Sequence, residues 1–108
     1  MAAGSFITFV RDQLRAFGPV DARPMFGGFG LYCEDVFFGI VHHDRLYFKT
    51  DSRSATAYIA QGMEPFRPNP RQTLKNYYEV PPDVLESEEE IAQWARTALQ
   101  VARNDVVS

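Results

Sequence analysis

The chain has 108 residues, of which 45% are hydrophobic and 23% are charged, and its formal net charge at pH 7 is −3. A chain of this length forms one domain that buries roughly 65% of the surface its unfolded form exposes, so neither a disordered nor a fibrous class fits. A net negative charge repels phosphate backbones, which excludes general nucleic-acid binding unless the basic side chains gather in one patch.

Two further features of the sequence indicate the compartment. The longest apolar run, Val36 to Val41, is far shorter than the ~20 residues that a bilayer span needs, and no secretory signal is visible at the N-terminus. Cys33 is the one cysteine, so no internal disulfide can form, which fits a reducing environment. We therefore predict a cytoplasmic protein.

The first predicted element is a helix over about residues 5–17. Phe6, Val10 and Leu14 recur at helical spacing, and charged residues fall on the other side. The glycine-proline pair at 18–19 predicts the end of the helix, because glycine accepts the left-handed C-terminal conformation and proline cannot continue a helix. The apolar stripe is expected to lie on a sheet.

An antiparallel meander follows. Three strand-like runs, about Arg23–Cys33, Val36–His42 and Arg45–Lys49, are separated by polar pairs short enough for hairpin turns. Glycines 27, 28 and 30 predict a bend, a bulge or close packing, since glycine costs conformational entropy in a strand. A phosphate-binding loop is rejected, because such loops lie between a strand and a helix, whereas here the chain continues as strand.

The second half of the chain predicts two helices and two extended segments. A short helix is expected over residues 50–61, followed by extended structure over 63–66 and 74–80 with a basic, proline-stiffened loop between them. The final helix begins after Ser87, which forms a capping box with Glu90. Two prolines at 81 and 82 end the preceding strand.

These elements define the predicted fold class. We expect a two-layer α+β domain with an antiparallel sheet of about five strands, helices packed on one face, and the order α-β-β-β-α-β-β-α. The single domain spans residues 1–108, with an ordered core over 4–104 and a frayed tail over 105–108.

The middle strands predict a partner for the sheet. Val36 to Val41 is apolar without alternation, which is unusual for an antiparallel sheet with one face in water. Strict alternation would place Phe38 and Ile40 on one face, and the helices can cover only one face. We therefore expect Phe38, Ile40 and Tyr47 to lie on the face that the helices leave uncovered. This face is expected to meet a second subunit or a partner protein, and we predict a homodimer.

Charges separate along the second half of the chain. The segment 66–78 carries Arg67, Arg71 and Lys75 with no acid, while 83–90 carries five acids with no base. Two interpretations stay open: solvated loops and a helix start, or a small basic ledge for an acidic partner. The candidate interaction surface therefore comprises Phe38, Ile40, Tyr47, Arg67, Arg71 and Lys75.

One cluster of residues suggests an enzyme. Cys33, His42 and His43 are the residue types of a thiol or metal site, but a thiolate needs a base beside it and a metal needs three or four converging ligands. Cys33 and His42 are expected toward opposite ends of neighbouring strands. We predict no catalytic, cofactor or metal site and no enzyme; a small metal- or thiol-dependent enzyme is the second alternative function.

Nucleic-acid binding is the first alternative function. Tyr47, Tyr77 and Tyr78 could stack bases on the sheet, with Lys49, Lys75 and Arg71 neutralising phosphates. The run at 45–49 matches the RNA-recognition-motif signature poorly, and the required strand-helix-strand order is absent. Net charge also disfavours direct nucleic-acid binding.

Several spaced motifs resemble one known family. They are MFGGFGLYCEDVFFGIVHHDRLYFKTD at 25–51, GMEPFRP at 62–68, YYEVPPDVL at 77–85 and EEIAQWARTAL at 89–99. In this order, over nearly the whole chain, they strongly resemble the N-terminal domain of TfoX/Sxy, the bacterial competence regulators. The resemblance implies an α+β fold and a role in regulating DNA-uptake (transformation) genes with a cyclic-AMP receptor protein. It implies no catalytic activity.

The sequence also departs from the full-length regulators. Those proteins carry a second, C-terminal domain, and this chain resembles the stand-alone members. The turn at 34–35 lacks the glycine that many relatives place there, which matters only for local geometry. We expect a non-enzymatic regulatory or protein-interaction module, without cofactor or membrane contact, that binds itself or a regulatory protein.

Overall fold

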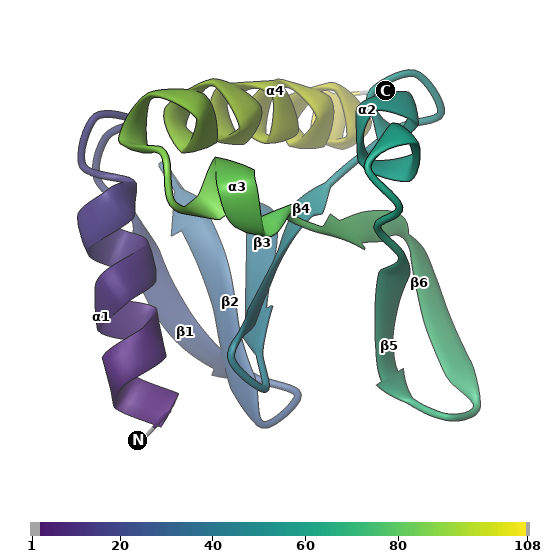
Figure 1. The fold of residues 1–108 in the computed structure, drawn as a ribbon, viewed down its shortest axis with the longest axis horizontal. Coiled ribbons are helices and arrows are strands. Elements are labelled where there is room, and N and C mark those ends of the chain that lie inside the picture. The colour runs from purple at the N-terminus through teal and green to yellow at the C-terminus, as the bar shows by residue number, and fades with distance from the viewer. Residues whose placement is uncertain (1–2, 108) are drawn as a thin grey trace.

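Six antiparallel strands form one sheet in the computed structural model, which describes residues 3–107 (Figure 1). The elements in chain order are α1 (Ala3–Gln13), β1 (Asp21–Met25), β2 (Gly28–Cys33), β3 (Val36–His42), β4 (Arg45–Lys49), α2 (Ala55–Ala60), β5 (Pro65–Asn69), β6 (Gln72–Glu79), α3 (Pro82–Leu85) and α4 (Glu88–Val107). The strands lie in the order β1-β2-β3-β4-β6-β5. The α+β class with an antiparallel sheet is confirmed, with six strands where about five were expected.

The additional strand comes from the first predicted run, which is two strands. A turn at Phe26 and Gly27 divides it, with φ angles of +53° and +79°. Met25 then pairs with Gly28, so β1 and β2 form a tight hairpin. Gly27 supplies the left-handed conformation that this turn needs, so the bend that the glycines predicted is confirmed.

The first helix is shorter than predicted, although its apolar stripe is as expected. Helix α1 ends at Gln13, and residues 14–17 form turns, in which the Phe17 amide donates to the Leu14 carbonyl at 3.0 Å. Leu14 is fully buried and Phe17 packs against the same core. The stripe therefore predicted which side chains are buried better than it predicted where the helix stops.

Helix α2 is also shorter than the predicted 50–61. The Thr50 amide donates to the carbonyl of Asn76 at 2.7 Å, which keeps this residue in the sheet. The Asp51 carboxylate then accepts from the amides of Arg53 and Ser54 at 3.1 and 2.7 Å and forms a turn before the helix. Ala55 is consequently the first helical residue.

The C-terminal region contains one helix that was not predicted. Helix α3 begins at Pro82, where the missing N–H is tolerated because the first helical amides have no partner within the helix. The Ser87 hydroxyl accepts from the Glu90 amide at 3.2 Å, which confirms one half of the predicted capping box. The Ser87 amide donates to the Val84 carbonyl at 3.1 Å rather than to the Glu90 side chain. Helix α4 continues past residue 104 to Val107. Fraying of the tail stays a prediction, and residue 108 lies outside the described residues.

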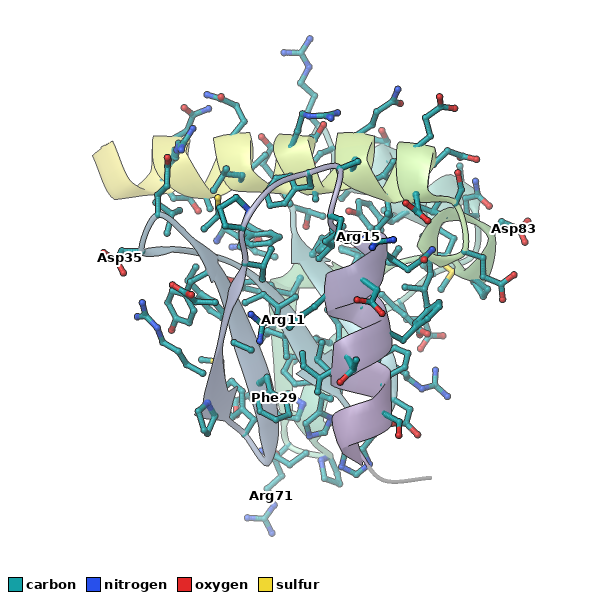
Figure 2. All side chains as sticks on the ribbon, turned by 90° about the vertical axis from the view of Figure 1, so that its left-hand side faces the viewer. Arg11, Arg15, Phe29, Asp35, Arg71 and Asp83 are labelled. Carbon is teal, nitrogen blue, oxygen red and sulfur yellow. The ribbon has the colours of Figure 1, made fainter. Side chains whose placement is uncertain are left out.

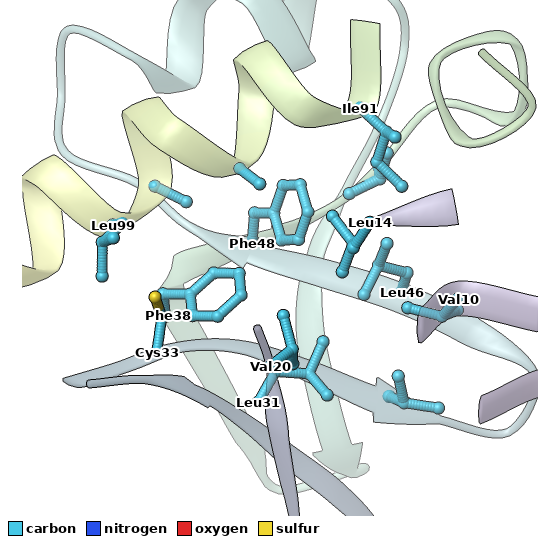
Figure 3. Close-up of a cluster of buried hydrophobic side chains, with 14 of the residues drawn as sticks. Val10, Leu14, Val20, Leu31, Cys33, Phe38, Leu46, Phe48, Ile91 and Leu99 are labelled. Carbon is cyan, nitrogen blue, oxygen red and sulfur yellow. The ribbon is translucent and has the colours of Figure 1, made fainter. Parts of the chain in front are cut away.

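Helices α1, α3 and α4 cover one face of the sheet and enclose the main core (Figure 1). Phe38 and Phe48 are fully buried at its centre, with ring centroids 5.8 Å apart. Figure 3 shows them between the sheet and α4, with Leu14 of the α1 segment close to Phe48. Burial of each such ring stabilises the fold by about 2–3 kcal/mol.

A β-bulge in β3 changes which residues share a face. Leu31 pairs with Gly39 and Tyr32 pairs with Phe37, which leaves Phe38 as an extra residue. The extra residue shifts the alternation by one position, so Phe38 joins the main core while Ile40 lies in a second cluster. The prediction that these two share one face was therefore wrong.

The second cluster buries part of the other face from within the chain. It contains Ile40, Tyr47 and Phe66, with Leu74 packed against it. Phe66 and Leu74 pair with each other in the β5–β6 hairpin, whose register is irregular on both sides of Phe66. The tip of this hairpin bends away from β4 (Figure 1). The rest of this face is partly exposed, and the homodimer stays a prediction.

Both edges of the sheet contain proline. Pro24 lies in β1 at one edge, and Pro65 and Pro68 lie in β5 at the other. Proline is tolerated at an edge because no further strand needs its missing N–H. The prolines at 65 and 68 therefore exclude this segment from the centre of the sheet, but they allow it to form the edge strand β5.

Two glycines allow close packing. A Cβ atom on Gly28 would lie 2.0 Å from the carbonyl oxygen of Val41. One on Gly30 would lie 3.0 to 3.2 Å from the side chains of Met25, Phe37 and Tyr32. The close-packing interpretation of these glycines is confirmed.

Gly28→Ala is expected to lower the free energy of unfolding by about 2 kcal/mol or more, because the methyl group meets fixed backbone rather than a movable side chain. Urea unfolding followed by circular dichroism measures this. Gly27→Asn is the control, since a Cβ there meets open space and asparagine tolerates a positive φ. Equal stability of the two variants would contradict the close approach.

Candidate interaction surface

Three hairpin turns gather at one end of the molecule. The turns after β1, β3 and β5 lie at the lower edge of Figure 1, away from α4. Figure 2 shows Arg71 at this end and Asp35 and Asp83 toward the opposite one. The acidic first turn of α4, residues 88–90, belongs to the opposite end. The charge separation seen along the sequence is thus also a separation in space.

The β5–β6 hairpin gathers the predicted basic ledge. Arg67 lies on β5, Arg71 in the turn and Lys75 on β6, and all three are exposed. The turn is fixed by the Asn69 side-chain oxygen, which accepts from the Arg71 amide at 2.9 Å. We call Arg67, Arg71 and Lys75 the basic ledge.

The basic ledge is electrostatically unpaired within the part of the chain that the structure describes. Ion pairs there join Arg23 to Asp35, Arg45 to Glu79, Lys49 to Asp105 and Arg103 to Glu34. None of them includes a ledge residue. The three charges of the ledge are therefore available to a partner.

A groove lies beside the ledge, between the β3–β4 and β5–β6 hairpins. Strand β4 pairs with the C-terminal half of β6, from Tyr47 to Lys49, and the tip of the β5–β6 hairpin bends away from β4 (Figure 1). The space between them has a volume of about 400 Å³. Its lining residues, which define the hairpin groove, are His42, His43, Arg45, Tyr47, Arg67, Pro68, Asn69 and Pro70.

Two histidines form one wall of the hairpin groove. The His42 ring is buried, with its centroid 4.1 Å from that of His43 and 5.1 Å from that of Phe66. Burial lowers the pKa of His42, and the neighbouring His43 lowers it further, while a hydrogen bond to the backbone of Phe26 acts in the opposite direction. The environment of His42 therefore favours the neutral ring.

The predicted enzyme cluster is not assembled. Cys33 pairs with Val36 at one end of the β2–β3 ladder, whereas His42 lies at the other end of β3. Burial and the nearby Glu34 raise the pKa of the Cys33 thiol, which keeps it protonated. Across residues 3–107, no three metal-binding side chains cluster together. Cys33 belongs to the main core.

The three tyrosines proposed as a nucleic-acid platform do not share a face. Tyr47 is buried in the second cluster, Tyr77 packs against the same cluster, and Tyr78 packs against the main core. The ring centroid of Tyr78 lies 6.0 Å from that of Tyr58, under α2. Adjacent residues of a strand point to opposite faces, which separates Tyr77 from Tyr78.

The sheet carries a different row of aromatic rings, which sequence reasoning missed. Tyr32, Phe37 and Tyr77 form a row with centroid distances of 5.2 and 5.4 Å, and burial raises the pKa of Tyr77 to about 12. Arg23 lies 4.1 Å from the centroid of Tyr32, and Lys49 lies 5.2 Å from that of Tyr77. Both cations are already paired with carboxylates, so this row does not present free charge for phosphates.

The structure divides the candidate surface into two groups. Phe38 and Ile40 have no exposed surface and Tyr47 is 8% exposed, so none of the three forms a surface patch. The three residues of the basic ledge are exposed and belong to one hairpin. The hairpin groove was not predicted, because it depends on the bend of the β5–β6 hairpin, which no local sequence pattern indicates.

Taken together, these features define an α+β domain with an unpaired basic ledge and without an assembled catalytic cluster in its described part. The chain matches the model of the TfoX N-terminal domain over residues 12–102 and therefore belongs to that family. The family consists of non-catalytic regulatory domains of the competence-regulator type. No curated protein matches the chain. None of the helices within residues 3–107 is both long and apolar enough to cross a membrane.

Stability is expected to depend on the protonation of His42. Its folded pKa lies below its unfolded value, so the unfolded state takes up the proton first as the pH falls. The stabilisation is complete above the unfolded pKa of about 6.5 and is lost as the pH falls through the lower folded pKa. Urea unfolding at a series of pH values from 7.5 to 5 measures this loss.

His42→Gln is the test variant, because glutamine keeps hydrogen-bonding capacity without titrating in this range. In the His42→Gln variant, the free energy of unfolding is expected to decline less steeply below pH 6.5 than in the wild type. The His43→Gln variant is expected to show a smaller change in this slope, since it removes only the charge that neighbours His42. A His42→Gln variant that declines as steeply as the wild type would contradict the assignment.

Proposed function

We propose that this domain is a non-enzymatic regulatory module of the competence-regulator type, cytoplasmic, that binds an acidic segment of a partner protein at the basic ledge. The observation that carries the proposal is the unpaired charge of Arg67, Arg71 and Lys75 on one projecting hairpin. Family membership supports a regulatory role.

The exposed basic ledge supports an electrostatic mode of recognition. Phe38, Ile40 and Tyr47, which the sequence suggested as an apolar contact surface, are buried within the chain. The aromatic residues that remain on the second face, such as Phe37 and Tyr77, are only partly exposed. Exposed charges contribute to association mainly by steering and orienting the partner, which suits a reversible regulatory contact. The proposed partner is a protein rather than nucleic acid, because the net charge of −3 opposes a polyanion beyond the ledge itself.

The test uses affinity capture from the native host at natural expression, with protein and nucleic acid both analysed. The triple charge reversal Arg67→Glu, Arg71→Glu and Lys75→Glu is expected to weaken binding of the captured protein at least about tenfold. The loss is expected to shrink as salt is raised, because the ledge is exposed. Calorimetric titration of the purified pair measures the affinity.

A matched control reverses three exposed arginines elsewhere: Arg15→Glu, Arg53→Glu and Arg96→Glu. This variant carries the same change in net charge, so it separates a local site from general electrostatics. Equal losses in the two triple variants would contradict the proposed site. Recovery of nucleic acid in place of protein, or of the domain alone as a monomer, would overturn the proposed function.

A further inference from the structure

We infer that the hairpin groove is a binding site for a small ligand that joins a planar ring to a phosphate group, of which a mononucleotide is the simplest form. This goes beyond the proposed function, because the groove lies between the two hairpins and shares only Arg67 with the basic ledge. Its volume of about 400 Å³ is within the range of small-molecule sites.

The charged side chains of the groove suit a phosphate. Arg45 and Arg67 come from strands on opposite sides of the groove, and the lining contains no carboxylate. Arg45 donates through Nη1 to the Glu79 carboxylate at 3.0 Å, which orients its guanidinium but shares its charge. Arg67 makes no ion pair within the described residues, so it supplies the unshared charge. A phosphate between the two arginines would accept charge-assisted hydrogen bonds from both walls.

The aromatic side chains suit a planar ring. Phe66 meets His42 edge to face, and His42 packs against His43, so the His43 ring is supported from behind. His43 itself is exposed, so a further ring can extend this row from the solvent side. Pro68 and Pro70 line the groove from the other hairpin and offer rigid apolar surface.

The backbone at His43 shows that its side chain can be varied. His43 and Asp44 form a two-residue hairpin turn with φ angles of +51° and +58°. Such turns favour Asn-Gly or Asp-Gly, because both positions need the left-handed conformation. The turn therefore does not require a histidine at this position, and the Glu34-Asp35 turn reaches the same conformation without one. The side chain of His43 can thus be exchanged for another turn-forming residue without changing the backbone.

The experiment titrates the full chain with adenosine monophosphate, adenosine and inorganic phosphate, and follows backbone amide NMR shifts. We expect adenosine monophosphate to shift the amides of His43, Arg45 and Asn69 and to bind at least about tenfold more tightly than adenosine or phosphate alone, because only it engages ring and arginines together. No shifts at millimolar adenosine monophosphate would overturn the inference. If inorganic phosphate binds as tightly as adenosine monophosphate, the inference that the groove binds a planar ring is overturned.

Two variants test the residues. His43→Asn keeps a turn-favouring residue but removes the ring, and it is expected to weaken binding about fivefold or more without lowering the melting temperature. Arg45→Gln is expected to weaken binding about tenfold. Unchanged affinity in both variants would overturn the site.

The double charge reversal Arg71→Glu and Lys75→Glu separates this inference from the proposed function. It alters the basic ledge but leaves every lining residue of the hairpin groove in place. It is expected to weaken the binding of the partner protein and, because Arg71 adjoins the lining residue Pro70, also to weaken the binding of adenosine monophosphate through charge repulsion. The amide shifts caused by the nucleotide are still expected at His43 and Arg45. Shifts confined to residues 71–75 would place the nucleotide on the ledge and overturn the inference.

Discussion

The extra residue in β3 is the constraint on which both halves of the interior depend. Strict alternation would direct Phe38 and Ile40 to the same face, and the main core would lose the ring that packs on Phe48. The bulge sends Phe38 toward α4 and Ile40 toward Phe66, so one strand supplies two separate clusters. A run that is apolar at every position then has a physical use, because each of its faces packs against one of the two clusters.

The distribution of unpaired charge indicates where recognition is expected. The aromatic row on the second face is partly exposed, but the cations beside it are neutralised by Asp35 and Asp105. In the described part of the chain, the basic ledge and the hairpin groove both lie at the end where three hairpin turns meet (Figure 1). The same bend of the β5–β6 hairpin covers Ile40 and opens the groove beside Tyr47.

Local patterns predicted the features that local chemistry determines. The helical stripe through Leu14, the cap at Ser87 and the charge cluster of the basic ledge follow from neighbouring residues alone, and the structure contains each of them. The bulge at Phe38 and the bent hairpin depend on pairing between distant segments, so periodicity could not indicate them. For the same reason the ledge was predictable as a charged segment, whereas the groove, which joins residues 42–47 to 67–70, was not.

The prolines of the edge strands have a consequence for assembly. A neighbouring molecule that extends a sheet must pair with an uninterrupted row of backbone donors and acceptors, and Pro24 and Pro68 break that row on opposite edges. Growth of the sheet by strand addition is thus disfavoured at both edges. This favours contacts made by side chains, whose specificity depends on sequence, and it limits templated aggregation at high concentration.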